Sequence, residues 1–186
     1  MIEVPVAPFS ELYEMLPADG WLTREEAQLL HESVASITEP GPLLEVGAYK
    51  GRSTVLLASF GRTVHVVDPF AGFCDEDMDG QATKNAFQRN MTDRGITNVY
   101  LWPYRIEVFN LDVAEDCVMA YLDGDHTRKG TEVQLDASLK VNAQVIAVHD
   151  VNDSGDGLQV KQACLERLGA WTKRAGRLAV RDRRAS

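Results

Sequence analysis

The chain has little cysteine and no long apolar run. Its three cysteines, Cys74, Cys117 and Cys164, are widely separated and form no C-x-x-C pair, which argues against a disulfide framework or a cysteine zinc cluster and favours a reducing compartment. No segment approaches the roughly 20 apolar residues of a membrane-spanning helix. Residues 1–10 lack the basic start and apolar stretch of a signal peptide. We therefore expect a cytoplasmic protein with no membrane partner.

Basic residues are also in deficit. Lysine and arginine number 19 against 28 aspartates and glutamates, which gives a net charge of −9. This charge repels phosphate backbones and disfavours a nucleic-acid partner. The length of 186 residues and the apolar content of 45% are those of one globular core. We expect a single domain over residues 1–186, and the composition leaves a homo-oligomer open.

Short apolar runs alternate with helical patterns along the chain. Thr23 and the acidic turn after it predict a helix that ends before Pro40, within an N-terminal helical segment of about residues 1–40. Alternation at this spacing predicts an α/β fold with a doubly wound, mostly parallel sheet and helices on both faces. Ala175-Gly176 predicts a C-terminal antiparallel hairpin, which brings the sheet to seven strands. The expected strands are 43–46, 63–67, 99–102, 117–122, 143–148, 171–174 and 178–180, and the later helices are 53–60, 81–94, 127–140 and a stretch ending near 168.

Two features of the first half indicate a nucleoside ligand. The loop after the first expected strand contains Gly47 and Gly51, which let the backbone turn tightly and approach a ligand. Its spacing is not G-x-G-x-x-G, so a dinucleotide is disfavoured. Asp68 ends the second strand, where an acid can accept hydrogen bonds from both hydroxyls of a ribose. Taken alone, the glycines also suit an ordinary strand-to-helix turn, and Asp68 suits a cap ahead of Pro69.

Acids and histidines follow the fourth and fifth expected strands. Asp123-Gly124-Asp125-His126 follows one, and His149-Asp150 follows the other. Such clusters suit a hard divalent cation such as Mg²⁺, with Asp123 and Asp150 as ligands. His126 is a candidate base for a substrate hydroxyl. The alternative is that the acids cap helices and the rings are satisfied by neighbours, although burying so many charges without a function is costly.

These segments resemble a known family. Glu45-Val46-Gly47-Ala48-Tyr49-Lys50-Gly51-Arg52-Ser53-Thr54 is similar to motif I of class I S-adenosylmethionine-dependent O-methyltransferases. Asp68-Pro69-Phe70-Ala71-Gly72 resembles the end of their second strand. Asp123-Gly124-Asp125-His126 with His149-Asp150 resembles the metal-dependent branch that includes macrocin O-methyltransferase. The resemblance covers roughly residues 20–182, and a parallel sheet with a terminal hairpin is typical of methyltransferases.

The resemblance implies an S-adenosylmethionine cofactor, a small-molecule hydroxyl acceptor and a Rossmann-like methyltransferase fold. Its metal ligands would be Asp123 and Asp150, with Mg²⁺ as the expected ion, and His126 would be the base. Val151 stands where related branches place a metal-binding Asn, which leaves the metal requirement open. The residues implied in cofactor binding are Glu45, Gly47, Ala48, Tyr49, Gly51, Ser53, Asp68 and Asp123.

Two alternatives belong to other classes of protein. A cofactor-binding or assembly module with the same fold would bind the cofactor without turnover, and a nicotinamide-dependent oxidoreductase is disfavoured by the glycine spacing. Lid candidates are the N-terminal segment with Tyr13 and Trp21 and the acidic loop 73–80.

Overall fold

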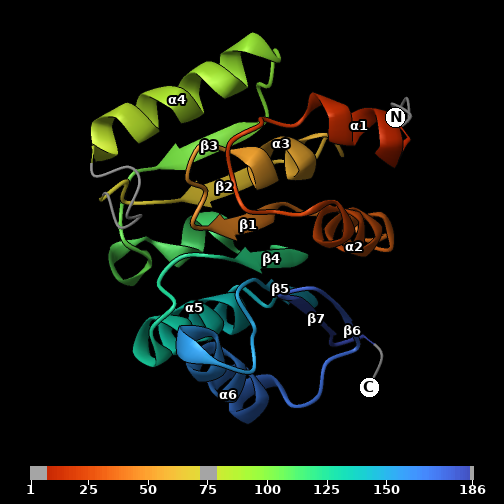
Figure 1. Ribbon diagram of the computed structural model, residues 1–186, viewed down its shortest axis with the longest axis vertical. Helices are drawn as coiled ribbons and strands as arrows, with labels where there is room; N and C mark the ends of the chain where they lie inside the picture. Colours follow the sequence, from red (N-terminus) through yellow and green to blue (C-terminus); the bar gives the residue numbers. More distant parts are fainter. Residues whose placement is uncertain (1–7, 72–78, 185–186) are drawn as a thin grey trace.

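The computed structural model describes residues 8–71 and 79–184, so most of the acidic lid candidate, up to residue 78, lies outside the described residues. Its centre is a seven-stranded sheet in the order β3-β2-β1-β4-β5-β7-β6 (Figure 1). Strands β1 to β5 are parallel, and β7 runs antiparallel to both β5 and β6. The strands are β1 Leu43–Val46, β2 Val64–Val67, β3 Val99–Trp102, β4 Met119–Leu122, β5 Val145–Val148, β6 Lys173–Ala175 and β7 Leu178–Asp182.

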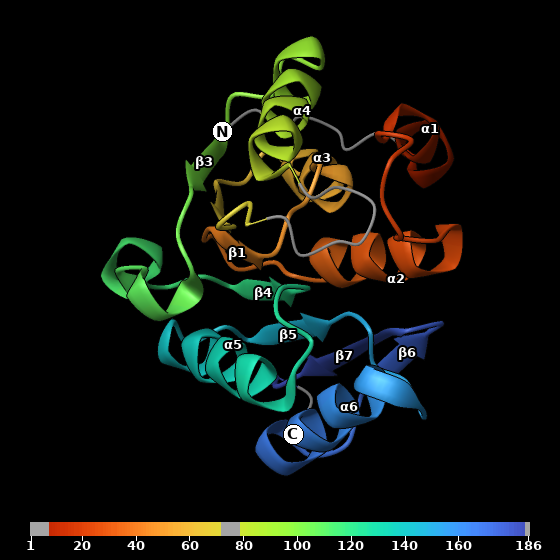
Figure 2. The ribbon, with the colours of Figure 1, turned by 60° about the vertical axis from the view of Figure 1, so that its left-hand side comes forward.

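Helices cover both faces of this sheet. Alternate strand residues such as Leu43 and Val66 pack with the first four helices, and their neighbours such as Leu44 and Val67 pack with the last two. The last two helices, α5 and α6, lie side by side in both views (Figures 1 and 2). The helices are α1 Phe9–Met15, α2 Arg24–Ala35, α3 Arg52–Ala58, α4 Gly80–Asp93, α5 Arg128–Lys140 and α6 Gly155–Leu168, with short 3₁₀ turns η1 Ile106–Val108 and η2 Leu111–Ala114.

Side-chain caps fix where several helices begin. Thr23 and Glu26 form a reciprocal capping box at α2, in which each side chain accepts a hydrogen bond from the other residue's backbone N–H. Thr127 caps α5 by accepting from Gly130 N. Asp79 caps α4 by accepting from Gln81 N and Ala82 N. The caps of α4 and α5 lie at the ends of the segments that follow β2 and β4, so they also fix where those segments end.

The register brings the strand ends to one level. Val46 pairs with Val67 on one side and with Leu122 on the other, and Leu122 pairs with Val148. The loops that follow these four strands therefore emerge together at the carboxyl edge of the sheet. Strand order reverses between β1 and β4, and ligands of open α/β sheets bind at such a switch point.

The predicted fold class is confirmed, including the seven strands and the antiparallel hairpin. Strand ends differ slightly, since the first hairpin strand begins at Lys173 rather than Trp171, and β4 begins at Met119 rather than Cys117. The two 3₁₀ turns were not predicted, because three or four residues are too few to show periodicity. Across the described residues, every helix is too short or too polar to cross a bilayer.

Candidate functional site

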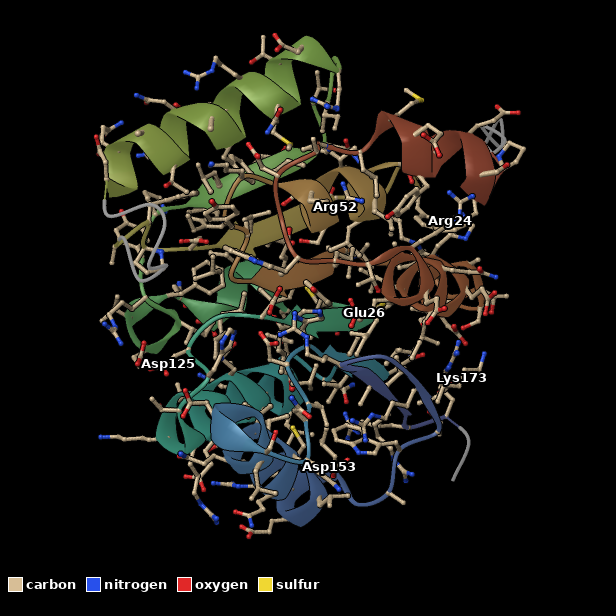
Figure 3. The ribbon with its side chains drawn as sticks, in the orientation of Figure 1. Arg24, Glu26, Arg52, Asp125, Asp153 and Lys173 are labelled. Carbon is tan, nitrogen blue, oxygen red and sulfur yellow. The ribbon has the colours of Figure 1, made fainter. Side chains whose placement is uncertain are left out.

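A cavity of about 750 Å³ opens at the carboxyl edge of the sheet, over the switch point. Its walls come from the loops after β1, β2, β4 and β5, from η1, and from the segment before α2. Pockets of this size hold cofactors and small molecules. Figure 3 labels three residues that bear on this site, Glu26 from α2, Arg52 from α3 and Asp125 from the loop after β4.

The glycine loop after β1 is shaped by close approach of the backbone. A Cβ on Gly47 would lie 2.3 Å from the Asp123 carbonyl oxygen, so glycine is required where the β1 and β4 loops meet. Gly51 has φ 88° and faces Met91 and Phe87 of α4 rather than the cavity. Gly47, Ala48, Tyr49 and Ser53 line the cavity. The loop therefore forms a wall of the cavity, and Gly51 acts through its conformation.

Glu45 is enclosed below this loop. Its side chain is fully buried, and its two oxygens accept hydrogen bonds from Ser53 Oγ and Thr54 Oγ1 at 2.5 and 2.6 Å. Burial outweighs these hydrogen bonds and, with the charges of Asp123 and Asp68, raises the pKa of Glu45 to about 8. Glu45 is not among the residues that line the cavity. In this structure it ties the start of α3 to β1, and it reaches a ligand only through Ser53.

Asp68 is occupied by the loop backbone. Its Oδ2 accepts hydrogen bonds from Ala48 N at 2.7 Å and Tyr49 N at 3.0 Å, and its Oδ1 accepts from Phe70 N at 2.7 Å. Because a carboxylate oxygen accepts about two hydrogen bonds, Oδ1 alone has capacity for another. Asp68 lines the cavity, so it can take one ribose hydroxyl rather than two. The capping alternative considered for Asp68 is thus also present.

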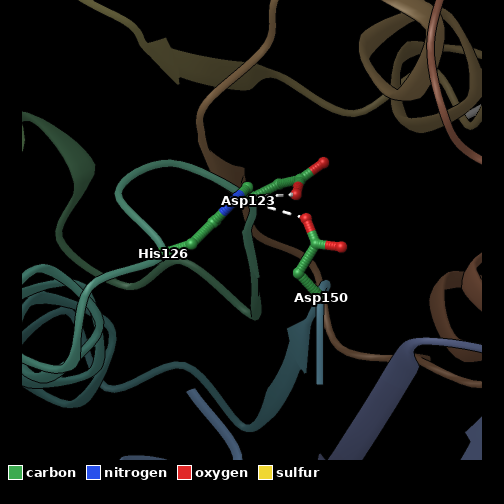
Figure 4. A group of neighbouring side chains, drawn as sticks. All are labelled: Asp123, His126 and Asp150. Atoms are coloured by element: carbon green, nitrogen blue, oxygen red, sulfur yellow. Dashed lines mark ion pairs between the residues drawn. The ribbon is translucent and has the colours of Figure 1, made fainter. Parts of the chain in front are cut away.

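Asp123, His126 and Asp150 come together on the opposite wall (Figure 4). His126 Nε2 lies 3.5 Å from Asp123 Oδ1 and 3.3 Å from Asp150 Oδ2. One donor atom from each of the three lies within 4.8 Å of the others. Burial alone would lower the pKa of His126. The interactions with Asp123 and the charge of Asp150 outweigh burial, so the pKa of His126 is raised above its ordinary value.

A buried imidazole stands behind these acids. His149 is 2% exposed, and its Nδ1 lies 3.1 Å from Asp123 Oδ1 and 3.5 Å from Asp150 Oδ2. Burial alone would lower its pKa, but the charge of Asp123 and the contacts with Asp150 and Glu26 raise the pKa of His149 to about 12. It therefore carries a proton at neutral pH, and together with His126 it holds the pKa of Asp123 below its usual range. The Tyr121 hydroxyl donates to Asp123 Oδ2 at 3.0 Å.

The donor set fits a divalent cation. Two carboxylates and one imidazole converge, and all three residues line the cavity. Asp150 has φ 55°, in the left-handed region that aspartate adopts more readily than most residues. His126 contacts both acids, and the guanidinium of Arg177, whose Nη1 lies 2.7 Å from Asp150 Oδ1, places a positive charge beside them.

The mouth of the cavity carries an aromatic pair. The rings of Trp21 and Tyr49 lie 5.0 Å apart at 39°, and Trp21 is 49% exposed. Arg52 holds this segment against the glycine loop by donating to the carbonyls of Leu22 and Pro17. The N-terminal lid candidate thus contributes Trp21, whereas Tyr13 packs on Phe9 and the guanidiniums of Arg24 and Arg52, away from the cavity lining.

Sequence reasoning missed two residues of this site. Glu26 is 1% exposed and contacts His149, although the sequence indicated only an acid in the first turn of α2. Arg177 follows the hairpin turn and contacts Asp150. Their partners lie 123 and 27 residues away along the chain, so no local pattern could have indicated them.

Several solved structures share the fold of this chain. No family model and no curated protein matches the chain. Among solved structures, the O-methyltransferase NovP is 16% identical over 95% of this chain and 88% of its own, with a TM-score of 0.70. CalS11, a TDP-rhamnose 3′-O-methyltransferase of calicheamicin biosynthesis, is 16% identical over 92% and 90%, with a TM-score of 0.57. The SAH-bound N-terminal domain of EvdMO1 is 20% identical over 73% and 50%, with a TM-score of 0.51. The chain has the Rossmann-like fold of these methyltransferases.

Proposed function

We propose that this protein is an S-adenosylmethionine-dependent methyltransferase that methylates a hydroxyl group of a small molecule. The observation that carries the proposal is a single cavity with two different walls. The glycine loop and Asp68 form one wall, and the cluster of Asp123, His126 and Asp150 forms the other. The fold shared with NovP and CalS11, both O-methyltransferases, supports it, as does SAH bound to the EvdMO1 domain. The described cysteines are free and buried, which fits a cytoplasmic location.

Each wall has a separate role in the proposed reaction. Gly47, Tyr49 and Ser53 would contact the cofactor, and the open acceptor position of Asp68 Oδ1 would take a ribose hydroxyl. When bound there, S-adenosylmethionine would supply a methyl group to an in-line acceptor oxygen, and the electron pair of the broken carbon–sulfur bond would stay on sulfur. Positioning contributes most to such a transfer, because both reactants are held close together.

The hydroxyl proton needs an acceptor on the other wall. His126 is the candidate base, because its Nε2 faces the cavity beside two carboxylates that stabilise the imidazolium formed on proton transfer. To act, it must be neutral when the acceptor arrives. A divalent cation held by Asp123 and Asp150 would supply positive charge that favours both the neutral ring and a developing alkoxide.

The acceptor would enter past Trp21 and Tyr49. These rings border the cavity between the glycine loop and open solvent, where an apolar ring face can pack on them. A flat or ring-shaped alcohol fits this entrance better than an extended polymer, and the excess of acidic residues in the chain disfavours nucleic acid.

Calorimetric titration with S-adenosylhomocysteine, with Mg²⁺ and with EDTA, tests the proposal. We expect saturable binding to the wild-type protein and to His126→Ala, because His126 lies on the acceptor side. His126→Ala should lower turnover about 10²-fold or more with an acceptor found by screening. An unchanged rate would remove His126 from the mechanism.

The other outcomes are equally informative. Binding without turnover on any acceptor would favour a cofactor-binding module, and absence of binding under every condition would overturn the methyltransferase proposal.

A further inference from the structure

Glu26 is a buried acid that the proposed reaction does not use. It lies in the first turn of α2 (Figure 3). It is 1% exposed, and both of its oxygens are engaged. Oε2 accepts from Thr23 N at 2.9 Å, and Oε1 accepts from Arg177 N at 2.8 Å. The same Oε2 lies 3.4 Å from His149 Nε2. One side chain therefore touches the N-terminal helix, the C-terminal hairpin and the end of β5.

A capping box explains only one of these contacts. Capping needs a single oxygen of Glu26 and is complete at an exposed helix end. Here the carboxylate is enclosed beside a buried histidine, where an ion is stable only if it is paired. Although burial favours its neutral form, the contact with His149 and the hydrogen bonds from Thr23 N and Arg177 N lower the pKa of Glu26 to about 2. Its charge therefore faces His149 across the whole neutral pH range.

Through His149 the contact of Glu26 extends to Asp123. His149 lies between the two acids, with Nε2 toward Glu26 and Nδ1 at 3.1 Å from Asp123 Oδ1. A hydrogen bond at Nδ1 and an ion pair at Nε2 together restrict the orientation of this ring. Carboxylate–histidine pairs behind a reactive or metal-binding group orient that group in the same manner.

Through the hairpin the contact of Glu26 also extends to Asp150. The bond from Arg177 N fixes the residue whose Nη1 lies 2.7 Å from Asp150 Oδ1. The Arg177 carbonyl in turn accepts from Val151 N, next to Asp150. Gly176 is fitted to this arrangement, since a Cβ there would lie 2.6 Å from Glu26 Oε1.

We propose that Glu26 is a positioning residue that orients Asp123 through His149 and Asp150 through Arg177. This inference rests on the proposed function for its kinetic consequence. Glu26 touches no cavity surface, so it acts on the proposed reaction only through these partners. It also makes the site depend on a helix that precedes the first strand.

Glu26→Gln tests the proposal, with Thr23→Ala as the matched control. Glu26→Gln removes the charge that faces His149, and we expect kcat to fall about 10- to 100-fold while the KM for S-adenosylmethionine stays within twofold. Thr23→Ala removes the other half of the capping box but keeps Glu26 charged, so it should lower thermal stability and leave kcat unchanged. Equal kcat losses in the two variants would overturn the proposal.

A double-mutant cycle separates positioning from structure. If Glu26 acts on Asp123 through His149, Glu26→Gln should lower kcat less in a His149→Asn protein than in the wild type, because only the route through Arg177 remains. Multiplied losses would show that it acts independently. Gly176→Ala gives a second route should Glu26→Gln fold poorly, because it displaces the carboxylate without changing its chemistry and should lower kcat in the same way.

Crystal structures of Glu26→Gln and Gly176→Ala provide a readout that needs neither turnover nor cofactor. We expect the His149 ring to turn and its contact with Asp123 to be lost. Side chains of His149, Asp123 and Asp150 that superimpose on the wild type would overturn the inference. If the wild-type protein binds no S-adenosylhomocysteine, the proposed function fails, and these structures still decide the role of Glu26.

Discussion

The two halves of the sheet end in acids that look alike in the sequence but have different partners. In the β1–β2 half, Glu45 within β1 accepts hydrogen bonds from the hydroxyls of Ser53 and Thr54 in α3. Asp68 after β2 accepts from backbone N–H groups of the loop after β1 and of its own loop. After β4 and β5, Asp123 and Asp150 are bonded to imidazoles and a guanidinium. The first pair uses most of its hydrogen-bonding capacity within the fold, whereas the second pair faces the cavity in a set of balanced charges.

This difference decides how available each acid is for chemistry. A carboxylate that accepts three backbone hydrogen bonds holds a loop in place and has little capacity left for a ligand. Carboxylates paired with protonated side chains can exchange those partners for a cation or a substrate, because the partners are movable. The acids of the β1–β2 half therefore hold the loops in place, and those of the β4–β5 half are available to a cation or a substrate.

Asp123→Asn should have the largest effect. It removes the charge opposite both His126 and His149, and it leaves a buried imidazolium without its nearest partner. We expect a stability loss on the order of 3 kcal/mol and a fall in turnover of about 10²-fold or more, measured by urea unfolding and by methyl transfer. Asp136→Asn, in an exposed ion pair with Arg167, is the control and should change neither. Wild-type turnover in Asp123→Asn would show that the β4–β5 acids are not needed for the reaction.

Asp68→Ala tests the β1–β2 half, whose acids hold the loops in place. Three backbone N–H groups lose their acceptor, so we expect a stability loss of about 3 kcal/mol and S-adenosylhomocysteine binding weakened at least about tenfold. Turnover at saturating cofactor should fall less than in Asp123→Asn, because the β4–β5 wall is intact. Calorimetry and saturation kinetics on both variants compare the two halves directly. If Asp68→Ala keeps full stability but loses cofactor affinity, Asp68 binds the cofactor and is not needed to hold the loop.

The sequence was sufficient for the fold and for which loops meet. Apolar runs and helix caps such as Thr23 are local signals, so β1 and β3 were predicted with their observed bounds. The convergence of Asp123, His126 and Asp150 also followed, because parallel strands bring their ends to one edge. What each acid bonds to did not follow. The enclosure of Glu45 and the contact of Glu26 with His149 depend on packing between distant segments. The predicted single domain, the site roles and the oligomeric state stay predictions.

Glu45→Gln tests the β1–β2 half through the pH dependence of its stability. The pKa of Glu45 is raised to about 8 in the fold against 4.5 when unfolded, so between these values the folded state keeps a proton that the unfolded state releases. Stability of the wild type should therefore fall as pH rises through this window, by on the order of 1 kcal/mol per pH unit.

The amide in Glu45→Gln is neutral at every pH and can still bond to Ser53 and Thr54. From pH 5 to 6.5 the variant should lose less stability than the wild type, by about 2 kcal/mol. Urea unfolding of both proteins across this range measures the difference, from which groups common to both cancel. Parallel curves would mean that Glu45 is ionised in the fold.

Trp21→Ala should have the smallest effect, and it extends the comparison to the mouth of the cavity. Because Trp21 is 49% exposed, its loss should change stability by no more than about 0.5 kcal/mol. The ring packs on Tyr49 at the outer edge of the glycine loop, so the KM of the acceptor should rise about tenfold, as for an exposed aromatic contact. Affinity for S-adenosylhomocysteine should stay within twofold, and Trp21→Phe should restore most of the acceptor affinity. A loss confined to cofactor affinity would instead place Trp21 on the cofactor side of the cavity, with the glycine loop.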